Sequence, residues 1–262
     1  MTHINDTTKW IGKESYYYDT ISSTNTKARE LAQKGCSHGT IILAEEQEAG
    51  VGRRGRSWSS SKGDGIYMSI VLRPDISPEQ SPMLTLVTAL AVAKAILTFS
   101  KASNVIPFIK WPNDIVLRGK KVCGILTELI LQKNVIDYVV IGVGINVHNS
   151  YFPSEIADTA TSLELELGHG VARERLVEQV LQEFEKCYAL FLQAGDLQLL
   201  KEDYQKLSAN KGREVCVLDP HGEYRGIAKG ITDDGELVVE TKEGTRLVSG
   251  GEVSVRGIYG YV

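Results

Sequence analysis

Apolar residues follow a helical period in several stretches of the chain. In residues 172–192 they recur every three or four positions, as at Leu176 and Val180, which is the spacing of an amphipathic helix. Gly35 and Gly195 follow two such stretches, at the position where glycine commonly ends a helix. These signals predict helices over residues 24–34, 83–99, 172–192 and 197–207.

The stretch 83–99 is apolar on nearly every side, which predicts a helix buried in a protein core. We expect Ser81 to be its N-cap and Pro82 to take the first helical position. Lys94 interrupts the stretch, which is also shorter than the roughly 20 mainly apolar residues of a membrane-spanning helix. We therefore expect no association with a membrane.

Two groups of β-rich segments predict strands. The first group comprises residues 16–21, 40–44, 66–72, 108–111, 115–117, 121–131 and 138–147. Short turns join the last four of these, which favours an antiparallel meander. The second group comprises residues 214–218, 224–231, 236–240, 245–248 and 252–256. Strands spaced so closely predict a small β-barrel. The change of pattern near Lys211 divides the chain into two expected domains, residues 1–210 and 211–262.

The composition is that of an ordinary folded protein. Hydrophobic residues make up 42% and charged residues 24% of the chain, which excludes wholesale disorder. The 29 Lys and Arg against 33 Asp and Glu give a net charge of −4, which disfavours a dedicated nucleic-acid binder. The first residues contain no signal-peptide core. Because the four cysteines form no CxxC pair, we expect reduced thiols in a cytoplasmic protein.

A segment rich in glycine and arginine, residues 45–58, is the most informative part of the chain. From Gly50 to Trp58 it reads GVGRRGRSW. Glycines let the main chain approach a ligand closely, and arginine guanidinium groups match phosphate and carboxylate oxygens. From the residues alone, a ligand-binding loop and a solvated basic loop balanced by neighbouring glutamates are about equally supported.

Two further segments place polar residues among apolar strands. Lys110 and Asp114 flank the sequence WPN, and Lys121 precedes VCGI. On their own, these residues are more simply explained as a surface ion pair and an exposed hairpin lysine. The segment GVGIN, which ends at Asn146, has glycines within an apolar strand. Such glycines indicate close approach of a ligand or of another main chain.

Taken together, the motifs resemble those of the biotin protein ligases. They are STN at residues 23–25, GVGRRGRSW at 50–58, KWPND at 110–114, KVCGI at 121–125, GVGIN at 142–146 and GGEVSVR at 250–256. Each motif alone is a weak signal. All six occur in the expected order between about Tyr16 and Arg256, which makes the resemblance specific.

The resemblance implies a two-step reaction. The carboxylate of biotin attacks the α-phosphate of ATP, with Mg²⁺, and gives biotinyl-5′-AMP and pyrophosphate. A lysine of a biotin carboxyl carrier protein or domain then takes the biotinyl group. The implied fold is α+β, with a catalytic domain like that of class II aminoacyl-tRNA synthetases, a mainly antiparallel sheet flanked by helices, and then a small SH3-like β-barrel. Family members are often dimers, so a homodimer or a monomer fits.

The resemblance also implies roles for individual residues. The residues that match biotin-binding positions are Ser23, Thr24, Asn25, Gln47, Gly50, Val51, Gly52, Arg53, Lys121 and Gly124. Those that match ATP-binding positions are Arg53, Arg56, Trp58, Lys110, Asn146 and Arg256, with Glu252 also at the nucleotide end. The implied catalytic residues are Arg53, Lys121 and Asp114.

The role of Asp114 and the valine at position 51 need separate comment. Asp114 either accepts or orients the proton of the acceptor lysine, or positions Mg²⁺ or a phosphate. Val51 stands where the family often has the first arginine of the loop. Because valine has no charge, only its main chain can serve there, and the loop has one side-chain cation fewer with which to hold biotinyl-AMP.

Two other functions remain as alternatives. A lipoate–protein ligase shares the fold but accounts less well for the Gly/Arg loop with Trp58. An RNA-binding module would use Arg53, Arg56 and the β-barrel, against the net negative charge. Longer members of the family carry an N-terminal DNA-binding domain. Since only about fifteen residues precede Tyr16, too few for an independent domain, we expect no DNA binding.

Overall fold

The computed structural model describes residues 7–219, 222–250, 254–257 and 261–262. The strands are β1 (Ser15–Ile21), β2 (Thr40–Gln47), β3 (Gly65–Leu72), β4 (Phe108–Lys110), β5 (Asp114–Leu117), β6 (Lys120–Gln132), β7 (Val135–Asn146), β8 (Glu214–Asp219), β9 (Gly222–Ile231), β10 (Leu237–Thr241), β11 (Gly244–Val248) and β12 (Ser254–Gly257). The α-helices are α1 (Thr24–Gln33), α2 (Met83–Ser100), α3 (Leu163–Leu167), α4 (Arg173–Ala194) and α5 (Gln198–Lys206).

The larger sheet has seven strands in the order β1-β2-β3-β7-β6-β5-β4. Its neighbouring strands are antiparallel except for β1 and β2, which run parallel. The meander predicted for β4 to β7 is confirmed. This sheet with its flanking helices has the α+β architecture that the resemblance implies.

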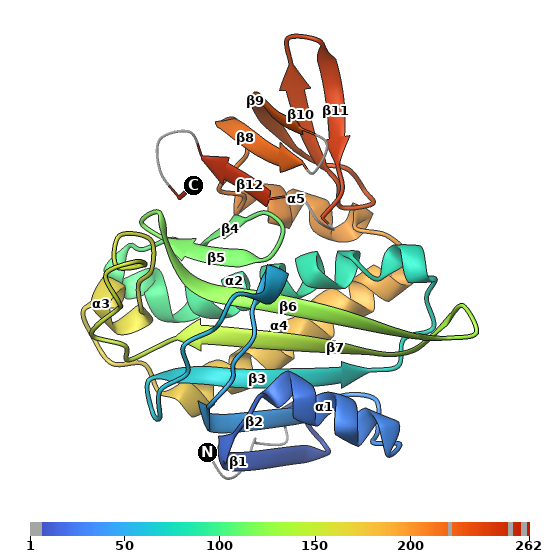
Figure 1. Ribbon diagram of the computed structural model, residues 1–262, viewed down its shortest axis with the longest axis vertical. Helices are drawn as coiled ribbons and strands as arrows, with labels where there is room; N and C mark the ends of the chain where they lie inside the picture. Colours follow the sequence, from blue (N-terminus) through green and yellow to red (C-terminus); the bar gives the residue numbers. More distant parts are fainter. Residues whose placement is uncertain (1–6, 220–221, 251–253, 258–260) are drawn as a thin grey trace.

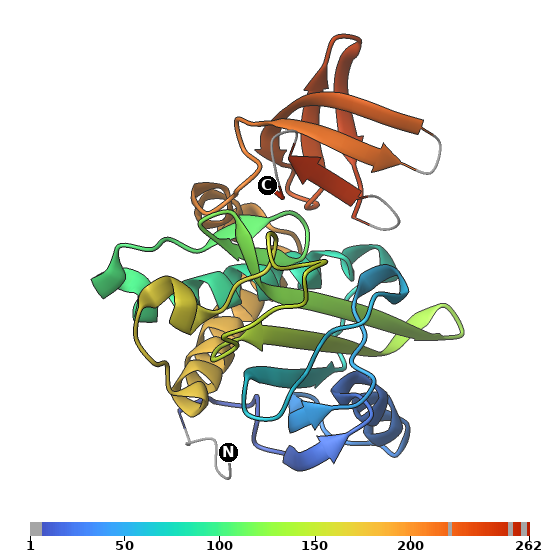
Figure 2. The ribbon, with the colours of Figure 1, turned by 60° about the vertical axis from the view of Figure 1, so that its left-hand side comes forward.

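Helices cover both faces of the larger sheet (Figures 1 and 2). Alternate residues of each strand supply the two cores, as Ile41 joins the cluster under α2 and α4 while Ile42 joins the one under α1. Ala28 and Ala32 form the buried side of α1. On the face that carries α1, the first half of β6 and the last half of β7 line the pocket described below.

Helix α2 is the central core helix, as predicted. Most of its apolar side chains are almost completely buried, which explains why a helix long and apolar enough to span a membrane is found inside this fold. The prediction of Ser81 as its N-cap was wrong. The Ser81 hydroxyl donates to the carbonyl of Pro78 instead, because a short 3₁₀ turn (Pro78–Gln80) precedes the helix.

The second sheet has five antiparallel strands in the order β11-β10-β9-β8-β12 and stands at one end of the first, beside β4 and β5 (Figure 1). Trp111 lies between the two sheets and is 2% exposed. Its Nε1 donates to the carbonyl of Gly235 at 3.0 Å, and its main-chain N–H donates to Oδ1 of Asn210 at 2.8 Å. These bonds fix the second sheet next to the KWPND turn.

Candidate active site

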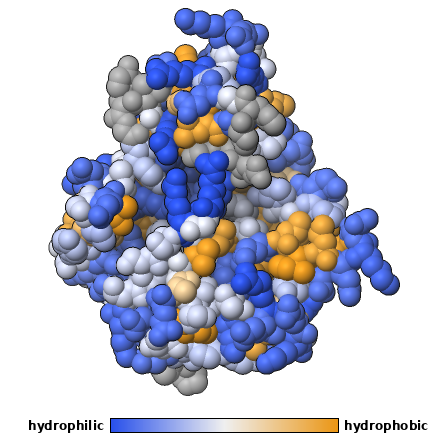
Figure 3. Space-filling view, in the orientation of Figure 1, coloured by the Kyte–Doolittle hydropathy of each residue, from blue (hydrophilic) through white to orange (hydrophobic). Residues whose placement is uncertain are grey.

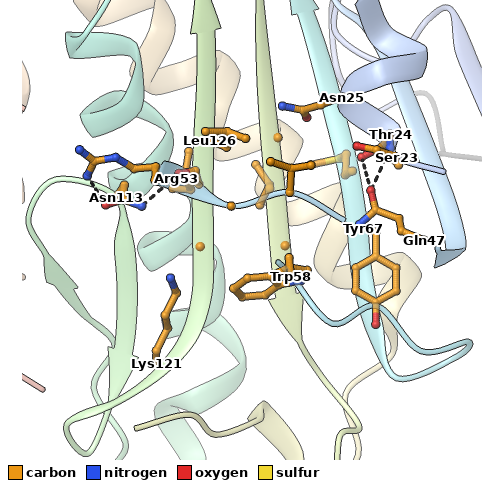
Figure 4. A pocket seen from close by; sticks show the side chains of 18 residues that line it. Ser23, Thr24, Asn25, Gln47, Arg53, Trp58, Tyr67, Asn113, Lys121 and Leu126 are labelled. Atoms are coloured by element: carbon orange, nitrogen blue, oxygen red, sulfur yellow. Dashed lines mark hydrogen bonds between the residues drawn. The ribbon is translucent and has the colours of Figure 1, made fainter. Parts of the chain in front are cut away.

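A pocket opens on the face of the larger sheet that carries α1. Figure 4 shows side chains from α1, β2, the Gly/Arg loop, β6 and β7 converging on it. Its lining residues are Ser23, Thr24, Asn25, Gln47, Val51, Gly52, Arg53, Trp58, Tyr67, Met68, Asn113, Lys121, Gly124, Ile125, Leu126, Gly142, Val143 and Gly144. The structure therefore brings five of the six sequence motifs to one place.

The floor of the pocket is main chain, because glycines of β6 and β7 face it. Gly124 pairs with Gly144 across the two strands, and the indole ring of Trp58 lies against both. A Cβ atom at Gly144 would stand 2.6 Å from the ring, and one at Gly124 would stand 2.9 Å from it. Trp58 Nε1 is buried and has no hydrogen-bond partner among the described residues, so it can donate to a ligand.

One end of the pocket is a network of uncharged polar groups. The main-chain N–H and the hydroxyl of Thr24 both donate to Oε1 of Gln47, at 2.8 and 3.1 Å. Gln47 Nε2 in turn donates to Oγ of Ser60 at 2.8 Å. Ser69 Oγ lies 2.8 Å from Oγ1 of Thr24 and 2.6 Å from Oδ1 of Asn25. This end is suited to a neutral ligand group with several donors and acceptors.

The opposite end is cationic. Lys121 Nζ lies 2.7 Å from Oδ1 of Asp114 and 5.3 Å from the centre of the Trp58 ring system. Arg53 is held in place by Oδ1 of Asn113 at 2.8 Å and by the carbonyl of Gly250 at 2.6 Å. Burial lowers the pKa of Arg53, and the charge of Asp114 partly opposes this effect. Two fixed cations here favour an anionic ligand group.

Lys110 and Asp114 lie beside this cationic end, and Tyr261 contacts both of them. The Nζ atom of Lys110 is 3.3 Å from the ring centre of Tyr261, and the Tyr261 hydroxyl donates to Oδ2 of Asp114 at 2.5 Å. Burial lowers the pKa of Lys110 to about 8; Asp114 opposes this shift, while Lys121 and Arg256 reinforce it. Strongly hydrophilic residues border the hollow between the two sheets (Figure 3).

The remaining residues predicted from the motifs lie around the pocket rather than in its lining. The carbonyl of Gly50 accepts a hydrogen bond from the main chain of Trp58 at 2.8 Å. Asn146 is buried and donates to the carbonyl of Thr161 at 3.0 Å. Arg56 and Arg256 are exposed, and both act electrostatically on Lys110. Glu252 lies outside the described residues.

Val51 lines the pocket but leaves its side chain largely exposed, at 52%. Its main chain pairs with Ser57 as an isolated antiparallel bridge. The hairpin that results carries Arg53 toward Asn113. Position 51 therefore contributes its main chain to the loop and no side-chain charge.

Three contributors were not predicted from the sequence. Asn113 orients Arg53, Ser69 joins the polar network, and Tyr261 contacts Asp114. Asn113 lies within the KWPND motif, so its neighbours offered a signal. Ser69 is one polar residue inside the buried strand β3, and Tyr261 is an isolated aromatic beyond the last motif, so neither had a local signal.

Comparison with known proteins relates this site to characterised families. Residues 17–146 match the model of the biotin/lipoate A/B protein ligase family, and residues 212–256 match that of the biotin protein ligase C-terminal domain. The chain is 38% identical to the bifunctional ligase/repressor BirA of Bacillus subtilis, over 95% of this chain and 76% of that protein. It is 33% identical to the biotin–[acetyl-CoA-carboxylase] ligase of Mycobacterium tuberculosis, over 90% and 87% of the two chains.

A solved structure shows the same likeness in three dimensions. It is the biotin protein ligase of Aquifex aeolicus in complex with biotin and ATP, which aligns with a TM-score of 0.81 at 30% sequence identity. The alignment covers 94% of this chain and 99% of that one. The likeness therefore extends over both sheets.

Proposed function

Since the chain belongs to the biotin protein ligases, we propose that its glycine-floored pocket holds biotin and biotinyl-5′-AMP, with a defined role for each surrounding side chain. The activity of the chain is ATP-dependent activation of biotin and its transfer to a lysine of a biotin carboxyl carrier protein or domain. The observation that carries the assignment of the pocket is its polarity, with an uncharged polar end and a cationic end facing each other across Trp58 (Figure 4).

The polar end receives the ureido group of biotin. Ser23, Thr24 and Gln47 supply donors and acceptors at the start of α1 and the end of β2, with Asn25 in the same network. The bicyclic ring then lies on the glycine floor beside Trp58, where an added side chain would exclude it. Biotin placed this way points its carboxylate toward Lys121 and Arg53.

The cationic end addresses the first difficulty of the reaction, the repulsion between a carboxylate and a triphosphate. One unit-charge contact at 4 Å is worth about 4 kcal/mol near a protein surface, before desolvation costs. Lys121 and Arg53 reduce this repulsion and stabilise the charge that develops as a carboxylate oxygen bonds to the α-phosphorus and pyrophosphate leaves. Their partners Asp114 and Asn113 fix both cations before substrate arrives, so little reorganisation is needed.

The nucleotide lies on the side of the pocket that faces the second sheet. Lys110, Arg56 and Arg256 are the cations available to its phosphates, and we assign Trp58 and Asn146 to adenine binding. Arg256 comes from β12, so the second sheet takes part in the nucleotide site. We propose that the catalytic domain ends near residue 210, where this smaller domain begins.

The described residues contain no group of three or more His, Cys, Asp or Glu side chains that could hold a metal ion. Asp114 contacts Lys121 through one oxygen and Tyr261 through the other. This arrangement does not fit a metal held by the protein alone. We therefore propose that Asp114 positions Lys121, and that Mg²⁺ enters as part of the MgATP substrate.

The second step requires a neutral lysine amine on the carrier protein. A lysine with pKa of about 10.4 is mostly protonated at neutral pH, and removing its proton costs roughly 4–5 kcal/mol. We propose that Asp114, the carboxylate paired with Lys121, orients that proton as the amine attacks the mixed anhydride and AMP leaves.

We also propose a cellular location, an absence of DNA binding and an oligomeric state for the enzyme. The four cysteines are free thiols, which supports a cytoplasmic location. The net charge of −4 and the convergence of Arg53, Lys110 and Lys121 on the ligand site support a ligase that works without binding DNA, as a monomer or a homodimer. A sequence-specific DNA footprint by the purified protein would contradict the absence of DNA binding.

Substrate competition tests the assignment of the pocket. The purified chain is incubated with ATP, Mg²⁺ and labelled pyrophosphate, and exchange into ATP is measured with biotin or with lipoate. We expect exchange that depends on biotin and is little affected by lipoate. Exchange supported by lipoate in preference to biotin would overturn the assignment.

A further inference from the structure

Tyr261 lies between Lys110 and Asp114, on the side of the site that we assign to the nucleotide. Its ring centre lies 3.3 Å from Nζ of Lys110, and its hydroxyl donates to Oδ2 of Asp114 at 2.5 Å. Lys110 and Asp114 are both almost completely buried, with 7% and 9% of the whole residue exposed. The phenol is thus a substantial part of what covers them.

Val262, which follows Tyr261, packs closely against the end of β12 in the second sheet. A Cβ atom at Gly257, the last residue of β12, would overlap the main chain of Val262. Glycine at this position is therefore what lets Val262 pack closely, and the packing of Val262 places the neighbouring Tyr261 over Lys110. The position of the ring depends on a contact outside the ligand site.

Several cations surround this phenol. Arg56 and Arg256 lie close enough to Tyr261 to act on it electrostatically, and Lys110 contacts its ring. A neutral phenol offers these cations only its π-face and one oxygen. A triphosphate offers charged oxygens that form shorter and stronger charge-assisted hydrogen bonds. The ring is therefore a weak occupant of a place suited to a strong anion.

We propose that Tyr261 is a displaceable plug of the nucleotide site: it covers Lys110 in the free enzyme and leaves when the phosphates of ATP bind. The proposal rests on the proposed function, which assigns Lys110, Arg56 and Arg256 to the nucleotide. Because ATP competes with the ring, the enzyme binds ATP more weakly than the same site would without Tyr261. Biotin, which enters at the other end, is unaffected.

Kinetics of biotin-dependent ATP–pyrophosphate exchange test the plug. A plug closed in roughly 70–90% of molecules raises the apparent KM for ATP about three- to tenfold. Tyr261→Ala therefore lowers the KM for ATP by about this factor and leaves the KM for biotin unchanged. Tyr261→Phe keeps the ring over Lys110 but loses the hydrogen bond to Asp114, so its KM for ATP lies between those of the wild type and Tyr261→Ala. Tyr151→Ala, which removes a tyrosine that is 79% exposed, is the matched control and changes neither constant.

Gly257→Ala provides a second test that does not depend on the folding of Tyr261→Ala. Gly257→Ala displaces Val262 without touching Tyr261, so it lowers the KM for ATP in the same direction, and calorimetry shows tighter ATP binding by the free enzyme. An unchanged or raised KM for ATP in Tyr261→Ala and Gly257→Ala would overturn the plug; a raised KM would instead show that Tyr261 holds the site in its active shape. Absence of biotin-dependent exchange in the wild type would overturn the proposed function itself.

Discussion

The Nζ atom of Lys121 lies 2.7 Å from Oδ1 of Asp114, at the cationic end of the pocket. The two residues come from β6 and β5, which pair as antiparallel neighbours with a bulge between Ile115 and Val116. Both side chains are largely buried, at 25% and 13% exposure, so the pair keeps a defined geometry. This pair holds the lysine charge at the place where we propose that a carboxylate and an α-phosphate meet.

Replacement of Lys121 by alanine tests its assignment to the first step. Loss of one preorganised charge donor typically costs about 2.7–4 kcal/mol in the barrier, or roughly 10²–10³ in rate. We expect Lys121→Ala to slow biotinyl-AMP formation by this factor while the KM for ATP changes much less. Single-turnover formation of the adenylate measures the effect, and Lys101→Ala, at an exposed site outside the motifs, is the control. A normal rate in Lys121→Ala would exclude the assignment.

A methyl group on the pocket floor tests the position of biotin. Gly144→Ala would place a Cβ atom 2.6 Å from the Trp58 ring, so the indole must move and the floor assigned to biotin changes shape. We expect the KM for biotin to rise at least tenfold. Gly170→Ala is the matched control, because a Cβ atom there meets nothing within 4 Å. If both variants bind biotin like the wild type, the ligand does not lie on this floor.

The pH dependence of ATP use tests the charge on Lys110. Burial lowers its pKa to about 8, so the side chain is charged below this pH and loses its proton as the pH rises through it. A neutral amine no longer attracts phosphate, and kcat/KM for ATP therefore falls between pH 8 and 9, by up to about tenfold. Lys110→Arg keeps its charge in this range and gives a flat profile. A flat profile in the wild type would contradict this role.

The patterns visible in the sequence account for the regular elements and for much of the pocket. Helices and the β4–β7 meander depend on apolar spacing and short turns, which are local signals. The structure places Thr24, Arg53 and Lys121 around one cavity, as the motifs led us to expect. The parallel pairing of β1 with β2 was not predicted, because it joins segments on either side of α1 and has no turn signal.

The contacts between the two sheets were also beyond the reach of the sequence. Tyr261 meets Asp114, which is 147 positions earlier in the chain, and no periodicity or motif links such distant residues. Helix α3 was missed for a different reason: it has only five residues, too few for a helical period. Its ends are nevertheless marked by the Ser162 hydroxyl and by Gly168 in the left-handed region.

The junction between the sheets can be tested through Asn210. This side chain is 1% exposed, and its Oδ1 accepts the main-chain N–H of Trp111 at 2.8 Å. Asn210→Ala leaves a buried donor without a partner, which costs about 1–3 kcal/mol. At roughly 2–4 °C per kcal/mol, we expect a clearly lower Tm in thermal unfolding, while the exposed neighbour Lys211→Ala stays unchanged. Equal Tm values for the two variants would show that this bond does not stabilise the junction.

Transfer of labelled biotin to a carrier protein tests the ligase activity and the role of Lys121 together. The purified chain is mixed with ATP, Mg²⁺, labelled biotin and a biotin carboxyl carrier fragment, and a parallel mixture without the carrier reports pyrophosphate release. We expect label on one lysine of the carrier and biotin-dependent pyrophosphate in both mixtures, with Lys121→Ala defective in both. A folded, biotin-binding protein that gives neither label nor pyrophosphate would contradict this expectation.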